Sequence, residues 1–524
     1  MAETPLPAAR EKRHAGDLPP WRVADLPEPL PFNFRNLFRT IGPGAILLAS
    51  SIGGGEWLIG PAAAVKHGLS VFWIATAAII LQTILNLEGI RYTLYTGEPI
   101  VTGIMRLRPS SRFWGSLYSL MTIAQLGVPA LAASCGPVIF AGLFHRIAGQ
   151  SDSGTVLFFT YFTIALGVAL LCFGGTIERM LERVSWAMIA YIFVFLTFAN
   201  VMFVPWKHWV TVFVGFFPLQ NVAGVWNGSI SMTDWIQTTD LLLLGTLAAT
   251  AGAGGIGNLT ISNWFRDKGM GMGSLVGAIG SVVGSEHQTM SGTGVVFPIT
   301  SENMRRWKTW WTYAKADQIW LWALGCFVGM FLNVNLATAL IPPGTNMEGL
   351  NTGTQQAAAM SGLWSGFWYL ALLNGFWILF STHLGNTDVM VRTVTDIWWV
   401  ASDKLRARAK GQISRVYYFI LFLATIWGCI AVLSGEAMSL FKFLGFMANL
   451  VLAISAVQVL IVNTTLLPKE LRPSYLRRGL LLICALFYGI FFVLMAGNEV
   501  RKFYSPLVAA KQAAVVLAVG RNVG

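Results

Sequence analysis

Charged residues are scarce in this chain. Of its 524 residues only 11% are charged, while 55% are hydrophobic. A soluble domain of this size carries about a quarter charged residues. The deficit, together with long apolar runs, excludes an ordinary soluble domain and predicts a protein embedded in a membrane.

Cysteine chemistry and the common catalytic motifs are also missing. No pair of the five cysteines has CxxC spacing, and all five lie in apolar runs, so neither a zinc site nor a disulfide framework is indicated. The sequence contains no HExxH, no GxSxG and no phosphate-cradling loop, which disfavours a membrane enzyme. We therefore expect no enzymatic activity and no permanently bound cofactor.

The N-terminal region lacks the apolar stretch of a signal peptide. Residues 1–35 are polar and rich in proline, and we interpret them as a flexible cytosolic tail. At the other end, residues 499–524 are expected to form a C-terminal tail. Within it, the apolar stretch at 505–520 is short and carries Lys511, so the sequence leaves open whether it is a twelfth membrane segment.

Long apolar segments are abundant, and about eleven can cross the roughly 30 Å of hydrocarbon in a bilayer. They lie near 40–66, 70–95, 114–144, 155–175, 185–205, 239–262, 316–341, 364–390, 416–435, 440–466 and 478–498. We expect an all-α transmembrane domain over residues 36–498. Its first repeat would span about 36–205 and its second about 239–466, followed by an extra helix at 478–498.

The positive residues are distributed unevenly across these predicted spans. With the N-terminus inside, 28 of the 36 Lys and Arg residues fall in inside segments and only four in outside loops. Cytoplasmic loops of membrane proteins carry such an excess. The net charge of +12 therefore indicates orientation and contact with the lipid bilayer rather than a nucleic-acid surface. We expect a multi-pass protein of the plasma (cell inner) membrane with a cytoplasmic N-terminus.

Two of the predicted spans carry dense glycine. Span one contains "GPGAILLASSIGGGEWLIGP" and span six "LLLLGTLAATAGAGGIGNLTIS". Glycine destabilises a helix interior by about 1 kcal/mol relative to alanine, and the two spans cross the membrane in opposite directions. Interrupted helices at matching positions of inverted halves indicate a transporter's binding site. The alternative is close helix packing through small residues, which explains three consecutive glycines poorly.

Glu56 directly follows the glycine run of span one. A carboxylate there could start a half-helix or form a buried ion pair, or it could bind a cation. Carbonyl groups freed around Gly53, Gly54, Gly252 and Gly254, with the side chains of Asn258 and Thr260, would add neutral oxygens. Glu56 and Asn258 are the candidate metal ligands. Oxygen-rich sites suit hard cations such as Mg²⁺ or Mn²⁺, or an ammonium group.

At these residues the chain resembles the Nramp metal-transporter family. The segment "GPGAILLASSIGGGEWLIGPAAAVKHG" aligns with that family's first helix, and "GGGE" at 53–56 takes the place of its DPGN motif. Gln82, "TG" at 96–97, "NLTIS" from Asn258 and "LLPKELRP" at 466–473 extend the match over about residues 36–498. The resemblance implies a LeuT-type fold with two inverted five-helix repeats and discontinuous helices 1 and 6. It also implies transport of a divalent metal ion.

The chain departs from this family at its functional positions. The family's metal-binding aspartate falls on Gly53, its asparagine on Glu56 and its thioether on Gly255. Pro129 and Ala132 fall near the acidic residues of the family's third helix, so we do not expect proton coupling. The broken-helix site with its one carboxylate remains, and it would favour a harder or partly hydrated cation.

Span eight adds candidates for an inner pathway. In "STHLGNTDVMVR", His383, Asn386 and Asp388 could line such a pathway, although a solvated helix end explains them about as well. The alternative substrate is an amino acid or organic amine, with its carboxylate on backbone amides and its ammonium group on Glu56.

Overall fold

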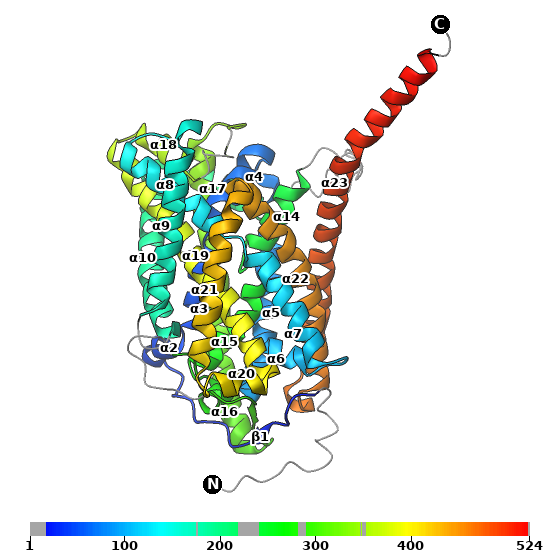
Figure 1. The fold of residues 1–524 in the computed structure, drawn as a ribbon. Helices are drawn as coiled ribbons and strands as arrows, with labels where there is room; N and C mark the ends of the chain where they lie inside the picture. Colours follow the sequence, from blue (N-terminus) through cyan, green and yellow to red (C-terminus); the bar gives the residue numbers. More distant parts are fainter. Residues whose placement is uncertain are drawn as a thin grey trace.

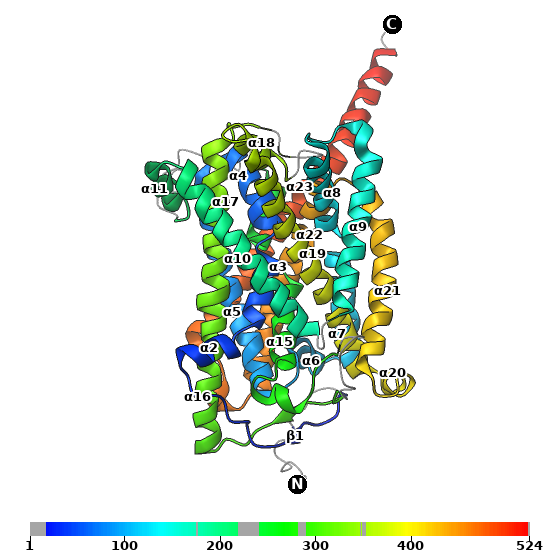
Figure 2. The ribbon, with the colours of Figure 1, turned by 90° about the vertical axis from the view of Figure 1, so that its left-hand side faces the viewer.

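The computed structural model describes residues 17–173, 177–217, 240–280, 290–345, 347 and 353–521, with side chains described to residue 501. Helices run roughly parallel to one another in a tall bundle (Figures 1 and 2). The last helix, α23 (Tyr475–Arg521), follows one side of the bundle and extends beyond it. Residues 505–520 therefore continue α23 as one helix.

The first half of the bundle contains the described helices before residue 218. Their bounds are α2 (Phe34–Thr40), α3 (Pro43–Ser51), η1 (Gly55–Ile59), α4 (Gly60–His67), η2 (Leu69–Val71), α5 (Trp73–Thr96), α6 (Ile100–Met105), α7 (Ser111–Leu126), α8 (Ala130–Phe144), η3 (Gln150–Asp152), α9 (Ser153–Leu171), α10 (Ile177–Phe203) and α11 (Trp206–Gly215).

The second half begins at Leu241. Its helices are α14 (Leu241–Thr250), α15 (Ile256–Asp267), η4 (Gly271–Leu275), α16 (Ser301–Lys315), η5 (Ala316–Ala323), α17 (Leu324–Leu340), α18 (Gln355–Ser361), α19 (Gly366–Ala401), α20 (Asp403–Arg408), α21 (Ile413–Ala431), η7 (Val432–Ser434), α22 (Ala437–Thr465), η8 (Lys469–Leu471) and α23. Among the described residues, a short sheet pairs β1 (Arg22–Val23) with β2 (Val295–Val296) in parallel.

The span count agrees with the sequence. Within the described residues, nine helices are long and apolar enough to cross a membrane. The two broken helices, predicted at 40–66 and 239–262, bring the total to eleven, although residue 239 itself lies outside the described residues. The predicted third span, 114–144, is not one uninterrupted helix, because Gly127–Pro129 separate α7 from α8.

The distribution of side chains is that of a protein surrounded by lipid. Large apolar residues are exposed on the outer helices, for example Phe158, Val194, Trp320, Phe422 and Leu486. Many polar side chains are instead fully buried between helices, where they bond to one another or to the backbone. Lipid is as apolar as these exteriors, so such a bundle is held together by packing and by hydrogen bonds.

The N-terminal region differs from its prediction. Residues 1–16 lie outside the described residues, but residues 17–33, here called the N-terminal strap, run along the lower end of the bundle in Figure 1. Trp21 and Leu26 of the strap are buried. Backbone hydrogen bonds join the strap to the β2 segment, and the Leu26 amide donates to Asn303 Oδ1 at 3.1 Å. This part of the chain is therefore packed rather than a free tail.

Glu98, in the turn between α5 and α6, holds the strap to the bundle. Its carboxylate accepts hydrogen bonds from Trp21 Nε1 (3.0 Å), Tyr92 Oη (2.7 Å), Arg106 Nε (2.9 Å) and the Gly294 amide (2.8 Å). Burial opposes the charged form, but the Arg106 charge and these hydrogen bonds outweigh it and lower the pKa of Glu98.

Candidate functional site

The predicted break in the first helix is present. α3 ends at Ser51, and the chain resumes helical geometry only in the wide turn η1, which begins at Gly55. The three glycines face three different neighbours. A Cβ on Gly53, Gly54 or Gly55 would collide, respectively, with Thr382 of α19, Phe441 of α22 and the Thr250 carbonyl of α14. The glycine run therefore lets three elements approach the break at once.

The sixth helix is also broken, between Thr250 of α14 and Ile256 of α15. Gly254 and Gly255 have φ values of +64° and +95°, in the left-handed region that favours glycine. The amide of Ala253 donates to Gln82 Oε1 at 2.8 Å, and Gln82 Nε2 donates to the Ala249 carbonyl at 3.1 Å.

A second glutamine supports the same break from α7. Gln125 Nε2 donates to the Gly254 carbonyl, and Gln125 Oε1 accepts from the Ile256 amide at 3.1 Å. Backbone groups freed inside a membrane must find partners within the protein, and these two glutamines provide them. The sequence analysis missed Gln125, because nothing near it in the chain indicates a partner 129 residues away.

Glu56 is placed differently from the ion ligand we expected. It is fully buried, and its Oε2 accepts a hydrogen bond from the Gly53 amide at 2.9 Å. Its Oε1 has no hydrogen-bond partner among the described residues. Glu56 is not among the residues lining the cavity between the two breaks. The carboxylate thus serves as an N-terminal cap for the second half of helix one.

Asn258 and Thr260 also make structural bonds. Asn258 Oδ1 accepts from the Gly255 amide at 3.0 Å, and its Nδ2 donates to Asn86 Oδ1 at 2.8 Å. The Thr260 hydroxyl donates to the Ile256 carbonyl at 3.0 Å and lies 2.9 Å from the Thr393 hydroxyl. Neither side chain lines the cavity, so the metal-ligand set expected from Glu56 and Asn258 does not assemble there.

Between the two breaks lies a small space that we call the central cavity. Its lining comes from both breaks and from two further helices: Ser50, Ser51, Gly54, Gly55, Thr250, Gly252, Ala253, Gly254, Thr382, Asn386, Phe441 and Leu444. Gly54, Gly252 and Gly254 are therefore where the sequence placed them, whereas Gly53 lies behind the lining, against Thr382. The polar atoms of this lining are neutral oxygens and amides.

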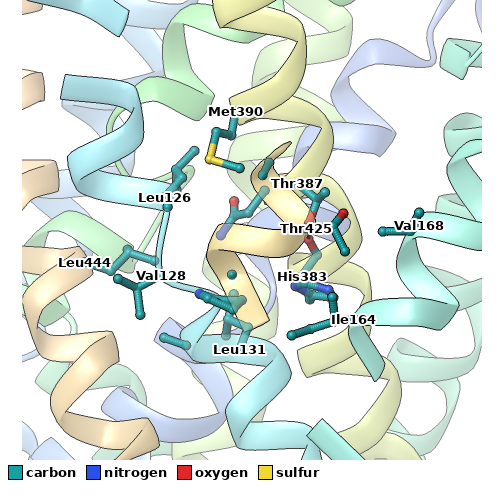
Figure 3. A pocket seen from close by; sticks show the side chains of 16 residues that line it. Leu126, Val128, Leu131, Ile164, Val168, His383, Thr387, Met390, Thr425 and Leu444 are labelled. Atoms are coloured by element: carbon teal, nitrogen blue, oxygen red, sulfur yellow. Dashed lines mark hydrogen bonds between the residues drawn. The ribbon is translucent and has the colours of Figure 1, made fainter. Parts of the chain in front are cut away.

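Beside it lies a second, larger space that we call the lateral chamber. The break between α7 and α8 forms one wall, and α9, α19, α21 and α22 form the others. Figure 3 shows His383, Thr387 and Met390 of α19 facing Leu126, Val128 and Leu131 across it. His383 and Asn386, which we predicted along an inner pathway, both line this chamber, and Asn386 lines the central cavity as well.

Asp388 does not join them. Its carboxylate accepts from Arg392 Nε (2.8 Å), Trp264 Nε1 (2.9 Å) and Tyr417 Oη (2.7 Å). Arg392 also pairs with Asp267 of α15. Asp388 therefore belongs to a buried ion-pair network that ties α15 to α19. Among the residues that the structure describes, no cluster of three or more His, Cys, Asp or Glu side chains could hold a metal ion.

No family model and no curated protein matches this chain. Solved structures do match it. A mutant of the manganese transporter of Eremococcus coleocola has a TM-score of 0.61 and 12% sequence identity, and the match covers 94% of this chain and 95% of that chain. A second mutant gives the same TM-score and identity, with coverage of 93% and 94%.

The same transporter in complex with an aromatic bis-isothiourea substituted compound matches with a TM-score of 0.58 and 12% identity, over 94% of each chain. At this identity the likeness shows the fold. The expected all-α membrane fold is confirmed by these matches, and the expected interruptions of helices 1 and 6 are present in this chain.

Proposed function

We propose that this protein is a secondary-active transporter that moves a divalent metal cation by alternating access around the central cavity. One observation carries this proposal. Two helices that cross the bundle in opposite directions are each interrupted midway, and both interruptions line the same cavity. The fold shared with a manganese transporter supports it.

The lining of the central cavity favours an ion that keeps part of its water shell. Hydroxyl and carbonyl oxygens suit hard cations, and Mg²⁺ in particular gives up its bound water reluctantly. With no carboxylate among the lining residues, complete dehydration of a divalent ion would be costly. Harder ions such as Mg²⁺ or Mn²⁺ therefore fit best, and the ion is the substrate rather than a resident cofactor.

The buried network between α15 and α19 suggests how the inner side closes. Arg392 of α19 holds Asp388 of its own helix and Asp267 of α15, and all three side chains are inaccessible to solvent. An ion leaving toward the inner face requires α15 to separate from α19, which breaks the contact between Arg392 and Asp267. This network would then act as the inner gate.

The orientation proposed from the sequence belongs to the same mechanism. The N-terminal strap, Arg106 and the gate network would face the cytoplasm, across the plasma (cell inner) membrane. The excess of Lys and Arg in the inside segments supports this assignment. Access of a labelling reagent to cysteines introduced at Arg22 and Lys207, which lie at opposite ends, tests it.

Uptake into liposomes containing the purified protein tests the transport function. We expect saturable uptake of Mg²⁺ or Mn²⁺ above that of empty liposomes. Gly54→Ala should reduce uptake, because the added methyl group lies within the central cavity against the movable ring of Phe441. Gly479→Ala is the matched control, since its methyl group would meet no atom within 4 Å.

Two outcomes contradict the proposal. One is the absence of uptake for Mg²⁺, Mn²⁺ and Ca²⁺ by a preparation that melts cooperatively. The other is uptake of an organic amine or amino acid without uptake of any divalent ion, which would establish the alternative substrate.

A further inference from the structure

Two polar side chains on α19 face the lateral chamber without a protein partner. His383 is 5% exposed, and Asn386 lies one turn further along the same face of the helix. Neither side chain makes a hydrogen bond within the described part of the chain, although both line the chamber. Nearly all buried polar groups in proteins have a partner, so the buried imidazole of His383, with the partly exposed Asn386 beside it, indicates a ligand that the protein itself does not supply.

Neutral oxygen atoms surround these two side chains. The hydroxyl groups of Thr387 and Thr425 each donate to a carbonyl of their own helix, at 2.8 Å and 2.7 Å, so their oxygen lone pairs are free to accept or to bind a cation. At the break in the third helix the Ala130 amide bonds to Val128 and not to Leu126. The Leu126 carbonyl, next to the chamber, thereby loses its helical partner.

The chamber adjoins the proposed transport site. Asn386 and Leu444 line both the lateral chamber and the central cavity, so the Asn386 side chain stands at the boundary between them. An ion in the central cavity can contact Asn386 from one side, and an ion in the chamber can contact it from the other. The imidazole of His383 is a nitrogen ligand, whereas the lining of the central cavity offers only oxygen and amide groups.

We propose that the lateral chamber is a second cation site, in which a ring nitrogen of His383 and the side-chain oxygen of Asn386 bind a divalent transition-metal ion. This inference rests on the proposed function. It adds that the second site would distinguish transition-metal ions from Mg²⁺ and Ca²⁺. Imidazole binds Co²⁺, Ni²⁺ and Fe²⁺ well, whereas Mg²⁺ and Ca²⁺ prefer oxygen ligands. No carboxylate is among the residues that line the chamber.

Gly167 of α9 makes room for the imidazole. A Cβ at this position would lie 3.2 Å from His383 Nε2, closer than an ordinary contact. Gly167→Ala therefore crowds the ring while leaving the histidine in place. It provides a second variant that perturbs the site without deleting a ligand, in case His383→Ala fails to fold.

Competition between Co²⁺ and Mg²⁺ for uptake into liposomes tests the site. In the wild type we expect Co²⁺ to inhibit Mg²⁺ uptake. His383→Ala should weaken that inhibition by about tenfold or more, the range seen when a group that positions a metal is lost, when inhibition is measured relative to each variant's own Mg²⁺ uptake. Gly167→Ala should weaken it less. His208→Ala is the control, because His208 lies on α11 and contacts Thr338.

Visible absorption of Co²⁺ bound to the full-length protein in detergent tests binding in the lateral chamber independently of transport. An absorption of nitrogen-bound Co²⁺ supports the site if it is present in the wild type and in His208→Ala but absent from His383→Ala. Equal Co²⁺ inhibition and equal absorption in the wild type, His383→Ala and Gly167→Ala would overturn it while leaving Mg²⁺ transport intact. If no divalent ion is taken up, the proposed function is contradicted instead. The Co²⁺ absorption alone then tests the cation site in the lateral chamber.

Discussion

Glu56 and Asn258 hold corresponding positions in the two broken helices. Each accepts a hydrogen bond from the amide three residues before it, Glu56 from Gly53 at 2.9 Å and Asn258 from Gly255 at 3.0 Å. A carboxylate and an amide thus perform the same task in the two helices whose breaks line the central cavity. The cap supplies a partner for an amide that the break leaves without one.

Because the cap needs an oxygen atom and not a charge, Glu56→Gln should preserve it. We expect Glu56→Gln to melt like the wild type in detergent, and Glu56→Ala to lose about 1 kcal/mol of unfolding free energy, as when other helix caps are removed. Melting temperature and uptake should be measured on the same preparations. Normal melting with abolished uptake in Glu56→Gln would instead assign the carboxylate to the ion.

Replacing a glutamine that supports the sixth helix should lower stability more than removing the Glu56 cap. Gln125→Leu leaves the Ile256 amide and the Gly254 carbonyl without partners, and each unsatisfied buried group costs about 1–3 kcal/mol. We expect a clear fall in melting temperature. Gln458→Leu on α22 is the matched control, because Gln458 Oε1 has no partner among the described residues. An equal effect of both substitutions would contradict this role of Gln125.

The glycine run makes a prediction about packing. Gly55→Ala drives a methyl group into the Thr250 carbonyl, which cannot rotate away as a side chain would. Overpacking of this kind destabilises proteins by about 1–3 kcal/mol, so we expect a lower melting temperature. Gly479→Ala, made in open space within α23, should be neutral or slightly stabilising. Unchanged stability of Gly55→Ala would mean that the two breaks are not in contact.

The positions of the breaks could be predicted from the sequence, because they depend on local composition. Glycine density within a membrane helix is a local signal, and it located both interruptions. The role of Glu56 was harder to predict, since a carboxylate beside a break can either cap a helix or bind an ion. Only the placement of its oxygen atoms relative to the Gly53 amide and the cavity separates these alternatives.

Features that depend on distant partners could not be predicted. Gln125 meets Gly254 only in the folded bundle. The break of the third helix had a local signal in Gly127 and Pro129, but a proline alone often only kinks a membrane helix. The strap was misread because a polar, proline-rich composition resembles a free tail, and the burial of Trp21 depends on a pocket made by later residues.

Glu98 should make attachment of the strap sensitive to acid. Its pKa in the folded protein lies below the ordinary value of 4.5, because the Arg106 charge and the hydrogen bonds from Arg106, Tyr92 and Trp21 outweigh the effect of burial. A lowered pKa contributes stability that is fully present above the ordinary value and is lost as pH falls through the folded value. The native contacts of Trp21 and Arg106 should therefore weaken as pH drops below about 4.5.

Hydrogen exchange of residues 17–31 measures this effect directly, after correction for the intrinsic dependence of exchange on pH. The strap of the wild type should be strongly protected at neutral pH and should lose protection on acidification. Glu98→Gln removes the ionisable group, so its strap should be less protected at neutral pH and change less with acid. Arg146, which pairs with Asp152 in the loop before α9, offers a control: Arg146→Gln breaks an ion pair that involves no strap residue and should leave the protection of Trp21 unchanged. Equal acid sensitivity of the wild type and Glu98→Gln would mean that another carboxyl group controls the strap.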